Sequence, residues 1–290
     1  MQGVALGVSY SNRWFTGDVG SSPLGFPITN VVGGVEFAPQ LTRHLRLRIS
    51  GGRRMVTDSE LSYGGMTDPA TGRTWGGVTR IFGHGALEYA TSSWTAYVGG
   101  GGAYLEGTDV IGNTEGEAGA GGNVKVWNLK DRQSLRVGLD LMYFGYERNT
   151  YFFTLGQGGY FSPSAYYGAM VPVEWSGHAG RWNWFLRGEA GYQNYHGGGS
   201  AYYPRNPGLQ AELPQGRGTF GGGGASGLAG NFGGRLVYQL TPRFRLGVNG
   251  GYTRAGSWSE ATGMLLFHYA FDAPDTARGA GSSRLSVDED

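Results

Sequence analysis

Glu115 and Glu117 have the residue type and spacing that could do chemistry, because two carboxylates two positions apart share one face of a strand. Paired carboxylates hydrolyse glycosidic bonds when one serves as the acid and the other as base or nucleophile. These two lie in a glycine-rich segment beside a loop, and the surrounding sequence gives no further sign of an active site. We therefore predict that they are not catalytic.

The other candidates for catalysis or metal binding are as weak. The five histidines are scattered along the chain: His44, His84, His178, His196 and His268. Their spacing does not match the HExxH pattern that binds zinc. Ser226 lacks the GxSxG pattern of hydrolase nucleophiles, and the glycine-rich stretch at 221–230 has no predicted helix to face a phosphate. We expect no enzyme activity, no cofactor and no metal site.

Composition narrows the fold and the partners. The 290 residues include 57 glycines and no cysteine, with 16% charged residues and a formal net charge of +1. This balance gives no electrostatic reason to expect nucleic acid as a partner. No run of about 18 apolar residues is present, so no transmembrane helix is predicted. A soluble all-β protein and a membrane β-barrel remain.

Candidate strands alternate apolar and polar residues. Within 134–143, Leu135 and Leu139 point to one face, while Arg136 and Asp140 point to the other. Three further segments repeat the pattern: 45–50, 84–89 and 243–253. A strand of a soluble sandwich would alternate in the same way, so alternation alone leaves both classes open.

Short and long connections also alternate along the chain. The short ones fall at 40–43, 91–93, 128–133, 177–181 and 241–242. The longer polar or Gly/Pro-rich ones fall at 15–27, 57–74, 107–115, 147–159, 195–219 and 255–259. Short periplasmic turns and long outer loops are typical of an outer-membrane β-barrel. About twelve strands are predicted, at 3–14, 28–38, 44–56, 75–90, 94–106, 115–128, 134–147, 161–176, 182–194, 226–240, 243–254 and 260–271. An even number places both ends on the periplasmic side.

Aromatic residues at strand ends favour the membrane. Trp94 and Trp182 begin strands directly after short turns, and Trp175 ends one directly before a turn. Amphipathic rings at these positions suit a membrane interface. The last strand finishes on Phe271, which resembles the terminal signal read by the bacterial outer-membrane assembly machinery, although a polar tail follows it.

We therefore predict an all-β fold, an antiparallel transmembrane outer-membrane β-barrel over residues 1–271, with a polar tail at 272–290. The chain opens on Met-Gln-Gly-Val, without the basic and apolar regions of a signal peptide. We expect Met1 to begin a fragment, with more sequence upstream.

Three irregular blocks carry a resemblance to a known family. Residues 62–80 read SYGGMTDPATGRTWGGVTR, residues 151–163 read YFFTLGQGGYFSP, and residues 17–26 read GDVGSSPLGF. The first two resemble signatures of the C-terminal domain of the bacterial cellulose synthase operon protein C family, the outer-membrane component of the cellulose secretion apparatus, and the third is similar to another block. With the final strands, the resemblance covers nearly the whole chain.

The resemblance implies a location in the bacterial outer membrane and a set of partners. Family members join a periplasmic solenoid of tetratricopeptide repeats to a sixteen-stranded barrel that passes the growing glucan across the membrane. The implied partners are the cellulose (β-1,4-glucan) chain, outer-membrane lipid, the periplasmic repeat region and the inner-membrane cellulose synthase complex. Because this sequence shows no helical repeat and about twelve strands, we expect the solenoid and the first four strands to lie upstream of Met1.

The polar face of the strands would then line the substrate path. Charges of both signs supply hydrogen-bond donors and acceptors for a neutral polymer without a strong field, and flat rings could stack on glucose units. The residues expected on the path are Arg46, Arg48, Arg80, Phe82, Glu88, Tyr97, Trp127, Arg136, Asp140, Phe144, Tyr146, Phe185, Arg187, Glu189 and Arg245. Each of them could instead only solvate or fill the interior.

Two alternative functions stay open at this point. A general porin, or an exporter of another exopolysaccharide, would share every physical feature described so far. A soluble β-sandwich that binds carbohydrate is the other alternative, and it would need no detergent. For the leading function, we expect the long loop at 195–219 and the segment at 151–163 to constrict or gate the outer opening.

Overall fold

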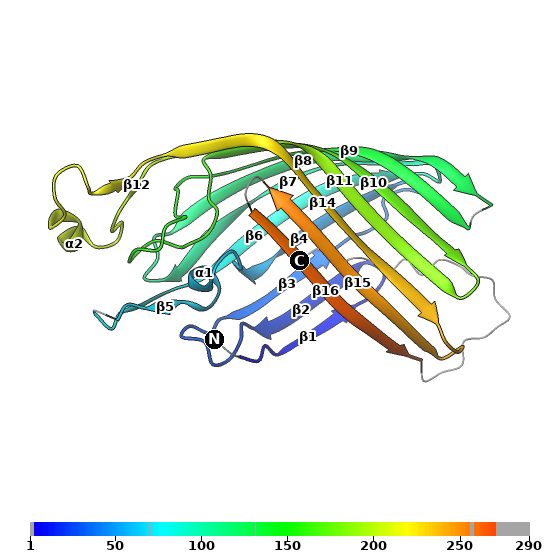
Figure 1. The fold of residues 1–290 in the computed structure, drawn as a ribbon, viewed down its shortest axis with the longest axis horizontal. Helices are drawn as coiled ribbons and strands as arrows, with labels where there is room; N and C mark the ends of the chain where they lie inside the picture. The colour runs from blue at the N-terminus through cyan, green and yellow to red at the C-terminus, as the bar shows by residue number, and fades with distance from the viewer. Residues whose placement is uncertain (1–2, 70, 131, 256–257, 271–290) are drawn as a thin grey trace.

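A computed structural model describes residues 3–69, 71–130, 132–255 and 258–270. Strands dominate these residues and pair in one large antiparallel sheet (Figure 1). Its strands, in hydrogen-bonding order, are β1 (Gly7–Ser11), β2 (Phe15–Ser21), β3 (Val31–Phe37), β4 (Leu45–Met55), β6 (Thr74–Ala90), β7 (Trp94–Thr108), β8 (Asn113–Leu129), β9 (Gln133–Tyr146), β10 (Ala165–Ala179), β11 (Trp182–Gly197), β14 (Gly223–Gln239), β15 (Phe244–Ala255) and β16 (Trp258–Tyr269).

Short elements lie in the connections. They are α1 (Glu60–Gly64), β5 (Met66–Thr67), which pairs with β6, α2 (Pro207–Ala211), and the hairpin of β12 (Ser200–Ala201) with β13 (Thr219–Phe220). Neither of the helices described is long and apolar enough to cross a membrane.

The sheet curves like part of a barrel wall, with the short turns at one end and the longer connections at the other (Figure 1). Each strand pairs with the next along the chain apart from the short hairpin elements. Among the described residues, β1 and β16 end the path and do not pair with each other. The predicted all-β antiparallel architecture is confirmed, as an open rather than a closed sheet.

The first strands differ from the prediction. The sequence predicts one strand at 3–14 and a loop at 15–27, but the chain reverses after β1 and continues as β2. Asn12 causes the reversal, because its side-chain oxygen accepts hydrogen bonds from the backbone N–H groups of Trp14 (2.9 Å) and Phe15 (3.0 Å). The path therefore holds thirteen described strands rather than twelve, and β1 starts at the loop end. Phe271 and the predicted tail at 272–290 lie outside the described residues.

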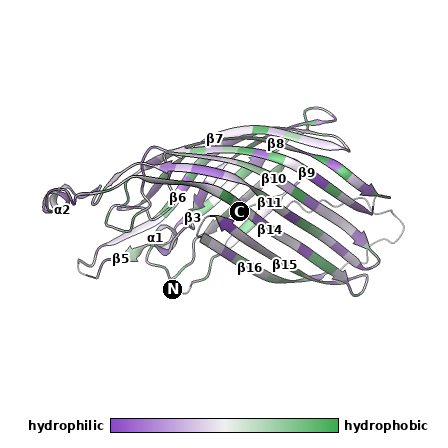
Figure 2. Ribbon diagram, turned by 45° about the horizontal axis from the view of Figure 1, so that its top comes forward, coloured by the Kyte–Doolittle hydropathy of each residue, from purple (hydrophilic) through white to green (hydrophobic). Residues whose placement is uncertain are grey.

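Hydrophobic and hydrophilic residues form bands along the strands in Figure 2, and successive side chains of a strand point to opposite faces of the sheet. One face, which we call the outer face, leaves large apolar side chains exposed, among them Val98 (57%), Leu141 (48%) and Leu265 (68%). No second layer covers it within the part of the chain described. This contradicts the sandwich alternative, in which the apolar face would pack against another sheet. We call the opposite face, against which the loop-end connections pack, the inner face.

Aromatic side chains mark both ends of the outer face. Near the turns, Trp182 lies 4.7 Å from Tyr238 between ring centroids, and near the loops Tyr143 lies 5.1 Å from Tyr167. Trp182 and Tyr192 are ten positions apart on β11. That separation is about 33 Å along a strand, or about 25 Å along the axis of a barrel whose strands tilt by about 40°. The apolar band therefore has the height of the hydrocarbon core that such barrels cross.

The hydrophobic core lies at the loop end, where connections fold together. Its buried members are Leu61, Trp75, Val78, Ala103, Leu105, Val110, Leu155 and Tyr160, with Val56, Met66, Phe82, Tyr146, Tyr203 and Leu209 partly buried against them. These residues come from β6, β7 and β9 and from the connections at 56–73, 109–112, 147–164 and 198–222. We call these four connections the loop cap.

Candidate functional site

The inner face holds most of the residues predicted to line a substrate path. Directly opposed residues of an antiparallel pair share one face, and by this criterion fourteen predicted residues lie on it: Arg46, Arg48, Arg80, Phe82, Glu88, Tyr97, Arg136, Asp140, Phe144, Tyr146, Phe185, Arg187, Glu189 and Arg245. Their shared face is thus established. Their contact with a substrate stays a prediction.

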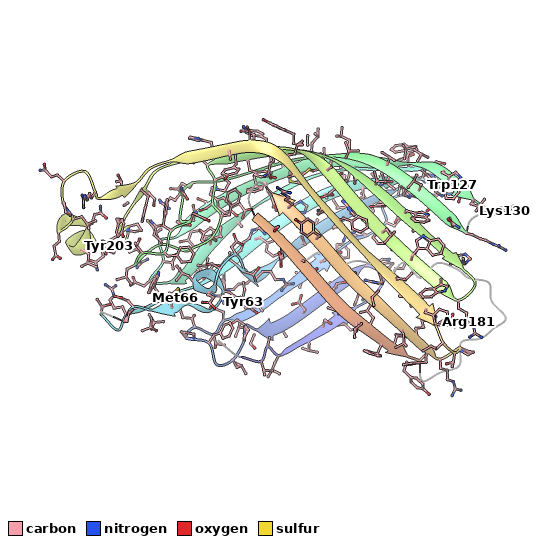
Figure 3. All side chains as sticks on the ribbon, viewed as in Figure 1. Tyr63, Met66, Trp127, Lys130, Arg181 and Tyr203 are labelled. Atoms are coloured by element: carbon pink, nitrogen blue, oxygen red, sulfur yellow. The ribbon has the colours of Figure 1, made fainter. Side chains whose placement is uncertain are left out.

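The prediction that Trp127 lines the inner path is wrong, because the structure places this residue on the outer face. The pairing of β8 with β9 steps from Lys125 opposite Arg136 to Trp127 opposite Leu135, which leaves Val126 as an extra residue in β8. Such a bulge breaks the alternation from which the inward orientation is predicted. The side chain is 44% exposed near the turn end of the sheet, where Figure 3 labels it. Trp127 therefore does not line the inner face.

Arg80 on β6 binds two carboxylates of β8. Its Nε lies 2.6 Å from Oε2 of Glu115 and its Nη2 lies 3.1 Å from Oε2 of Glu117, while the ring of Phe82 lies 5.1 Å from its guanidinium carbon. The two carboxylates considered for glycoside hydrolysis are thus both counter-ions of one arginine. This arrangement gives them a structural role on the wall.

Arg187 on β11 forms the second such centre. Its guanidinium lies 3.1 Å from Glu174, 3.2 Å from Glu189 and 3.6 Å from Asp140. Asn231 on β14 donates a hydrogen bond of 2.6 Å to Glu189 and extends the network to a fourth strand. One cation is thus shared among three anions that come from three different strands.

Arg48 forms a third centre on β4. It lies 2.5 Å from Glu36 on β3 and 2.8 Å from Glu88 on β6. Nearby, Arg54 binds Asp18 at 2.6 Å. Because these arginines are matched by carboxylates, this part of the wall offers many donors and acceptors but no large field of one sign. Such a surface suits a neutral, hydroxyl-rich chain.

Gly121 makes room for a contact that crosses three strands. The hydroxyl of Tyr97 on β7 donates to Oδ1 of Asp140 on β9 at 3.2 Å, above the intervening strand β8. A Cβ at Gly121 would lie 2.1 Å from the same oxygen. Only glycine therefore permits this tyrosine and carboxylate to meet.

Some arginines of the inner face form no ion pair. Within the described residues, no ion pair joins Arg46, Arg136 or Arg245 to a carboxylate, although Arg136 donates a hydrogen bond of 2.7 Å to Asn123. The predicted mixture of signs is therefore not uniform along the wall. Paired and unpaired arginines lie at the same level of the wall, because Arg136 and Arg187 both lie opposite Glu174 and Arg46 lies opposite Glu88, the partner of Arg48.

Aromatic rings gather on the inner face beneath the loop cap. Phe144 stacks on Tyr166 with 4.5 Å between ring centroids, and Phe161 meets Tyr195 edge to face at 5.0 Å. Tyr146 lies 6.2 Å from Phe144, and we call these five residues the inner aromatic cluster. The sequence prediction misses three of them. Extending the alternation of β10 and β11 would have placed Tyr166 and Tyr195 inward, whereas Phe161 lies in a connection and carries no such signal.

Residues 151–163 and 198–219 of the two segments predicted to constrict the opening belong to the loop cap, which is tied together by hydrogen bonds. Asn113 donates to the hydroxyl of Tyr160 at 3.1 Å, and burial raises the pKa of that phenol. The backbone N–H of Phe161 donates to Asp58 at 2.8 Å. Gln157 donates to Ser200 at 2.8 Å and so joins the two longest connections.

Ion pairs add a further link at the rim of the loop cap. Asp109 binds Arg73 at 2.5 Å and Arg205 at 3.4 Å, so one carboxylate connects three of the four connections. The cap is therefore a packed unit over the loop end of the wall. A role in gating stays a prediction. In the part of the chain described, no group of three histidine or acidic residues could hold a metal ion.

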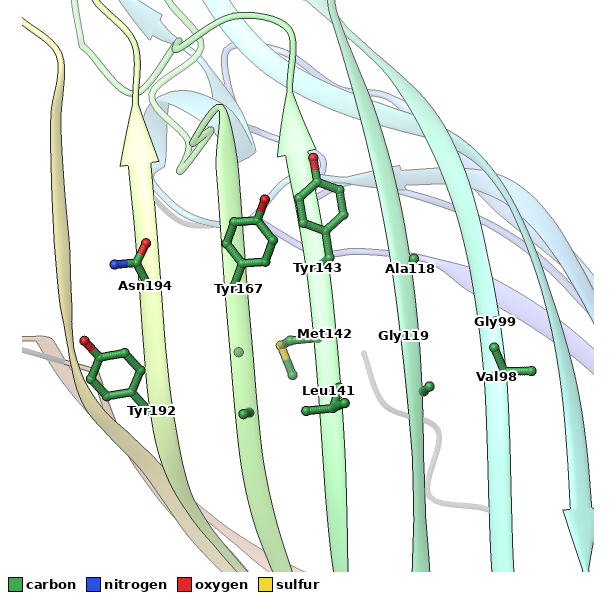
Figure 4. A pocket seen from close by; sticks show the side chains of 13 residues that line it. Val98, Gly99, Ala118, Gly119, Leu141, Met142, Tyr143, Tyr167, Tyr192 and Asn194 are labelled. Atoms are coloured by element: carbon green, nitrogen blue, oxygen red, sulfur yellow. The ribbon is translucent and has the colours of Figure 1, made fainter.

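A hollow of about 790 Å³ does not belong to this site (Figure 4). Its side chains include Val98, Leu141, Tyr143, Tyr167 and Tyr192, all of which cross-strand register places on the outer face. Small residues between these larger ones create the depression. It is a dip in the apolar band and not part of an inner path.

Comparisons with known proteins agree with this geometry. Residues 1–272 match the family model described as Cellulose synthase operon protein C C-terminus. The chain belongs to this family. Cellulose synthase 2 operon protein C of Komagataeibacter xylinus is 69% identical over 272 residues, which cover 93% of this chain and 21% of the relative. Cellulose synthase operon protein C of Xanthomonas axonopodis pv. citri (strain 306) is 31% identical, covering 98% of this chain and 20% of the relative.

The chain thus spans about a fifth of the length of these members of the cellulose synthase operon protein C family. Among solved structures, a bacterial polysaccharide outer membrane secretin superposes with a TM-score of 0.54 and 12% identity, covering 91% of this chain and 77% of the other. This likeness supports the barrel type of fold. The family match confirms the resemblance carried by the three sequence blocks.

Proposed function

We propose that this chain forms the wall of an outer-membrane channel through which a β-1,4-glucan chain is exported. The observation that carries the proposal is the inner face itself. It combines arginines compensated by carboxylates with the inner aromatic cluster beneath the loop cap. Repeated weak contacts of this kind let a polymer slide, whereas one strong site would stall it. The family name and the polysaccharide-secretin likeness support the same substrate class.

The channel is passive in this proposal. It guides the glucan chain through the placement of its side chains and the shape of its interior. Chemical synthesis belongs to other proteins of the operon, with which the longer protein would connect through its periplasmic region. Lipid covers the outer face between its two aromatic belts. Residues 1–271 would form the wall and residues 272–290 a separate polar tail.

Planar-bilayer conductance of the full-length protein tests the function. Cello-oligosaccharides should reduce the current more strongly as their length increases, and malto-oligosaccharides of equal length should do so less. Equal block by both sugars would favour a general porin or an exporter of another polysaccharide. Current that is indifferent to all sugars would contradict a glucan path.

A matched pair of double variants tests the inner aromatic cluster. Phe144→Ala with Tyr166→Ala removes a stacked pair from the inner face, and Tyr143→Ala with Tyr167→Ala removes a ring pair from the outer face of the same two strands. Only the inner pair should weaken the block by cello-oligosaccharides. An equal loss in both double variants would mean that the rings act through strand stability and not through the sugar.

Deleting residues 204–216 tests the predicted gate. The deletion removes α2 and Arg205, which holds the connection to Asp109. The open-channel conductance should rise while the response to cello-oligosaccharides is kept. No change in conductance would rule out this connection as a constriction.

A further inference from the structure

The short turns carry an uncompensated belt of positive charge. Five of the six described turns hold a basic residue, and we call these residues the turn cations: Arg13, Arg43, Lys130, Arg132, Arg181 and Arg243. All six are exposed. The turns contain one acidic residue in the sequence, Asp131, which lies outside the described residues. Even with that charge subtracted, the belt keeps a formal charge of 6 − 1 = +5.

Arginines elsewhere in the described chain are mostly paired. On the inner face Arg48, Arg80 and Arg187 each bind at least two carboxylates. At the loop end, Arg73 and Arg205 share Asp109. No ion pair with a described carboxylate involves a turn cation. The turn end thus gathers six exposed cations without a described carboxylate partner, whereas Arg217 and Arg254 are the exposed arginines without one in the described part of the loop end.

The turn cations stand directly beside the aromatic belt of the outer face. Arg181 precedes Trp182, which packs on Tyr238, and Arg243 precedes Phe244 at the start of β15. One residue of a strand advances by about 3.3 Å. Rings at the interface therefore place these cations just outside the hydrocarbon, at the depth of lipid phosphates. Figure 3 labels Lys130 and Arg181 at this end of the sheet.

Two adjacent turns bring such cations together. The guanidinium of Arg181 donates to the carbonyl of Leu240 at 3.4 Å, and the backbone N–H of Gln239 donates to the carbonyl of Arg181 at 2.8 Å. Arg243 lies in the same turn as Leu240. The two arginines therefore flank one stretch of interface, where a single anionic headgroup could bind both.

We propose that the turn cations bind the headgroups of anionic phospholipids in the membrane leaflet that the turns face. The excess of positive charge selects a headgroup with net negative charge over a zwitterionic one, because only the former offsets it. The position beside lipid-facing rings favours a lipid over an acidic protein surface. This inference rests on the proposed insertion of the outer face into a membrane, and it is independent of what passes through the channel.

The test uses the full-length protein reconstituted in phosphatidylcholine vesicles with or without 20% phosphatidylglycerol. Spin-labelled phosphatidylglycerol should associate with the protein more strongly than spin-labelled phosphatidylcholine, and salt should reduce the difference. Arg181→Gln with Arg243→Gln should weaken the preference by about five-fold for each charge removed. The matched control is Arg217→Gln with Arg254→Gln, which removes two charges at the loop end and should keep the preference.

The outcomes separate this inference from the proposed function. Equal association of both lipids with the unaltered protein, or an equal loss in the control, would overturn the lipid site, even where the channel still conducts and responds to cello-oligosaccharides. A preference that appears only after residues 272–290 are deleted would also overturn it, because the acidic tail would then be the native partner. Failure of the protein to insert into vesicles would contradict the proposed function itself.

Discussion

At the loop end, four connections place side chains in one buried cluster around Leu61 and Tyr160, whereas at the turn end each connection is closed by a few backbone hydrogen bonds. The N–H of Thr91, which donates to the carbonyl of Trp94 at 2.9 Å, is typical of the turn end. One end is therefore held by packing between segments distant in sequence, and the other by local geometry. A change in the cap can spread through the cap, while a change in a turn acts on its own hairpin.

Charge distinguishes the two ends in the same way. The loop end pairs several of its arginines with carboxylates, as Asp109 does for Arg73 and Arg205, and leaves Arg217 and Arg254 without such a partner among the described residues. The turn end leaves its cations exposed to the surroundings. We infer that charged groups at the loop end hold the connections together, whereas the cations at the turn end bind groups outside the protein.

The largest effect is expected from emptying the centre of the cap. Tyr160→Ala removes a ring that is 1% exposed, and such a truncation costs about 3–5 kcal/mol. The cost should fall on the cap alone, so channel conductance should rise and proteases should cut within 147–164, while the strands stay folded. Trp94→Ala, which removes a 44% exposed ring at the turn end, should leave both the conductance and the protease cleavage unchanged. Loss of the folded wall in the Tyr160 variant would refute the separation of cap from wall.

A smaller effect is expected beneath the cap from Arg80→Gln. Glu115, whose side chain is 6% exposed, and Glu117 would lose their cation, at a cost of about 1–3 kcal/mol. Two uncompensated carboxylates should also shift the reversal potential towards cation selectivity. Arg46→Gln, near the turn end, should shift selectivity in the same direction without a measurable loss of stability, because it breaks no described ion pair. Similar stability losses in both variants would remove the contrast between the two ends.

At the turn end, Asn12→Ala should cost about 1 kcal/mol in urea unfolding, since two backbone N–H groups lose their acceptor. Asn12→Asp keeps a side-chain oxygen and should retain most of that stability. The effect should be confined to the β1–β2 hairpin and leave cap protection unchanged. Increased proteolysis of 147–164 in the alanine variant would show that the ends are coupled after all.

Most of the wall follows from the sequence, because the alternation of apolar and polar residues along a strand is a local property. Leu139 and Asp140 fall on the faces that their types predict. The predicted faces and strand bounds are wrong where a single residue shifts the alternation or turns the chain. Val126 turns Trp127 to the other face, and Asn12 ends the first predicted strand in a tight turn, so that β2 lies where a loop is predicted.

The cap shows what a single sequence cannot provide. Composition and length predict that 151–163 and 195–219 are long loops near the opening. Their packing depends on contacts between distant residues, such as Asn113 with Tyr160 and Gln157 with Ser200. No spacing within one segment encodes such pairs. The inner aromatic cluster was predictable only in part. Tyr166 continues the alternating pattern of a strand, whereas Phe161 lies in a connection and belongs to no such pattern.

The smallest predicted effect is a response of the cap to alkaline pH. Burial raises the pKa of Tyr160, so the folded cap favours the protonated phenol. The stability that the protonated phenol adds to the folded cap is fully present below the ordinary phenol pKa of about 10. It is lost as pH rises from there through the raised pKa. Conductance should therefore increase reversibly above about pH 10. Tyr160→Phe cannot ionise and should show no such increase, although it gives up the hydrogen bond from Asn113. An identical rise in both proteins would assign the response to groups outside the cap's centre, and a rise without any change in protease protection at 147–164 would place it in the wall.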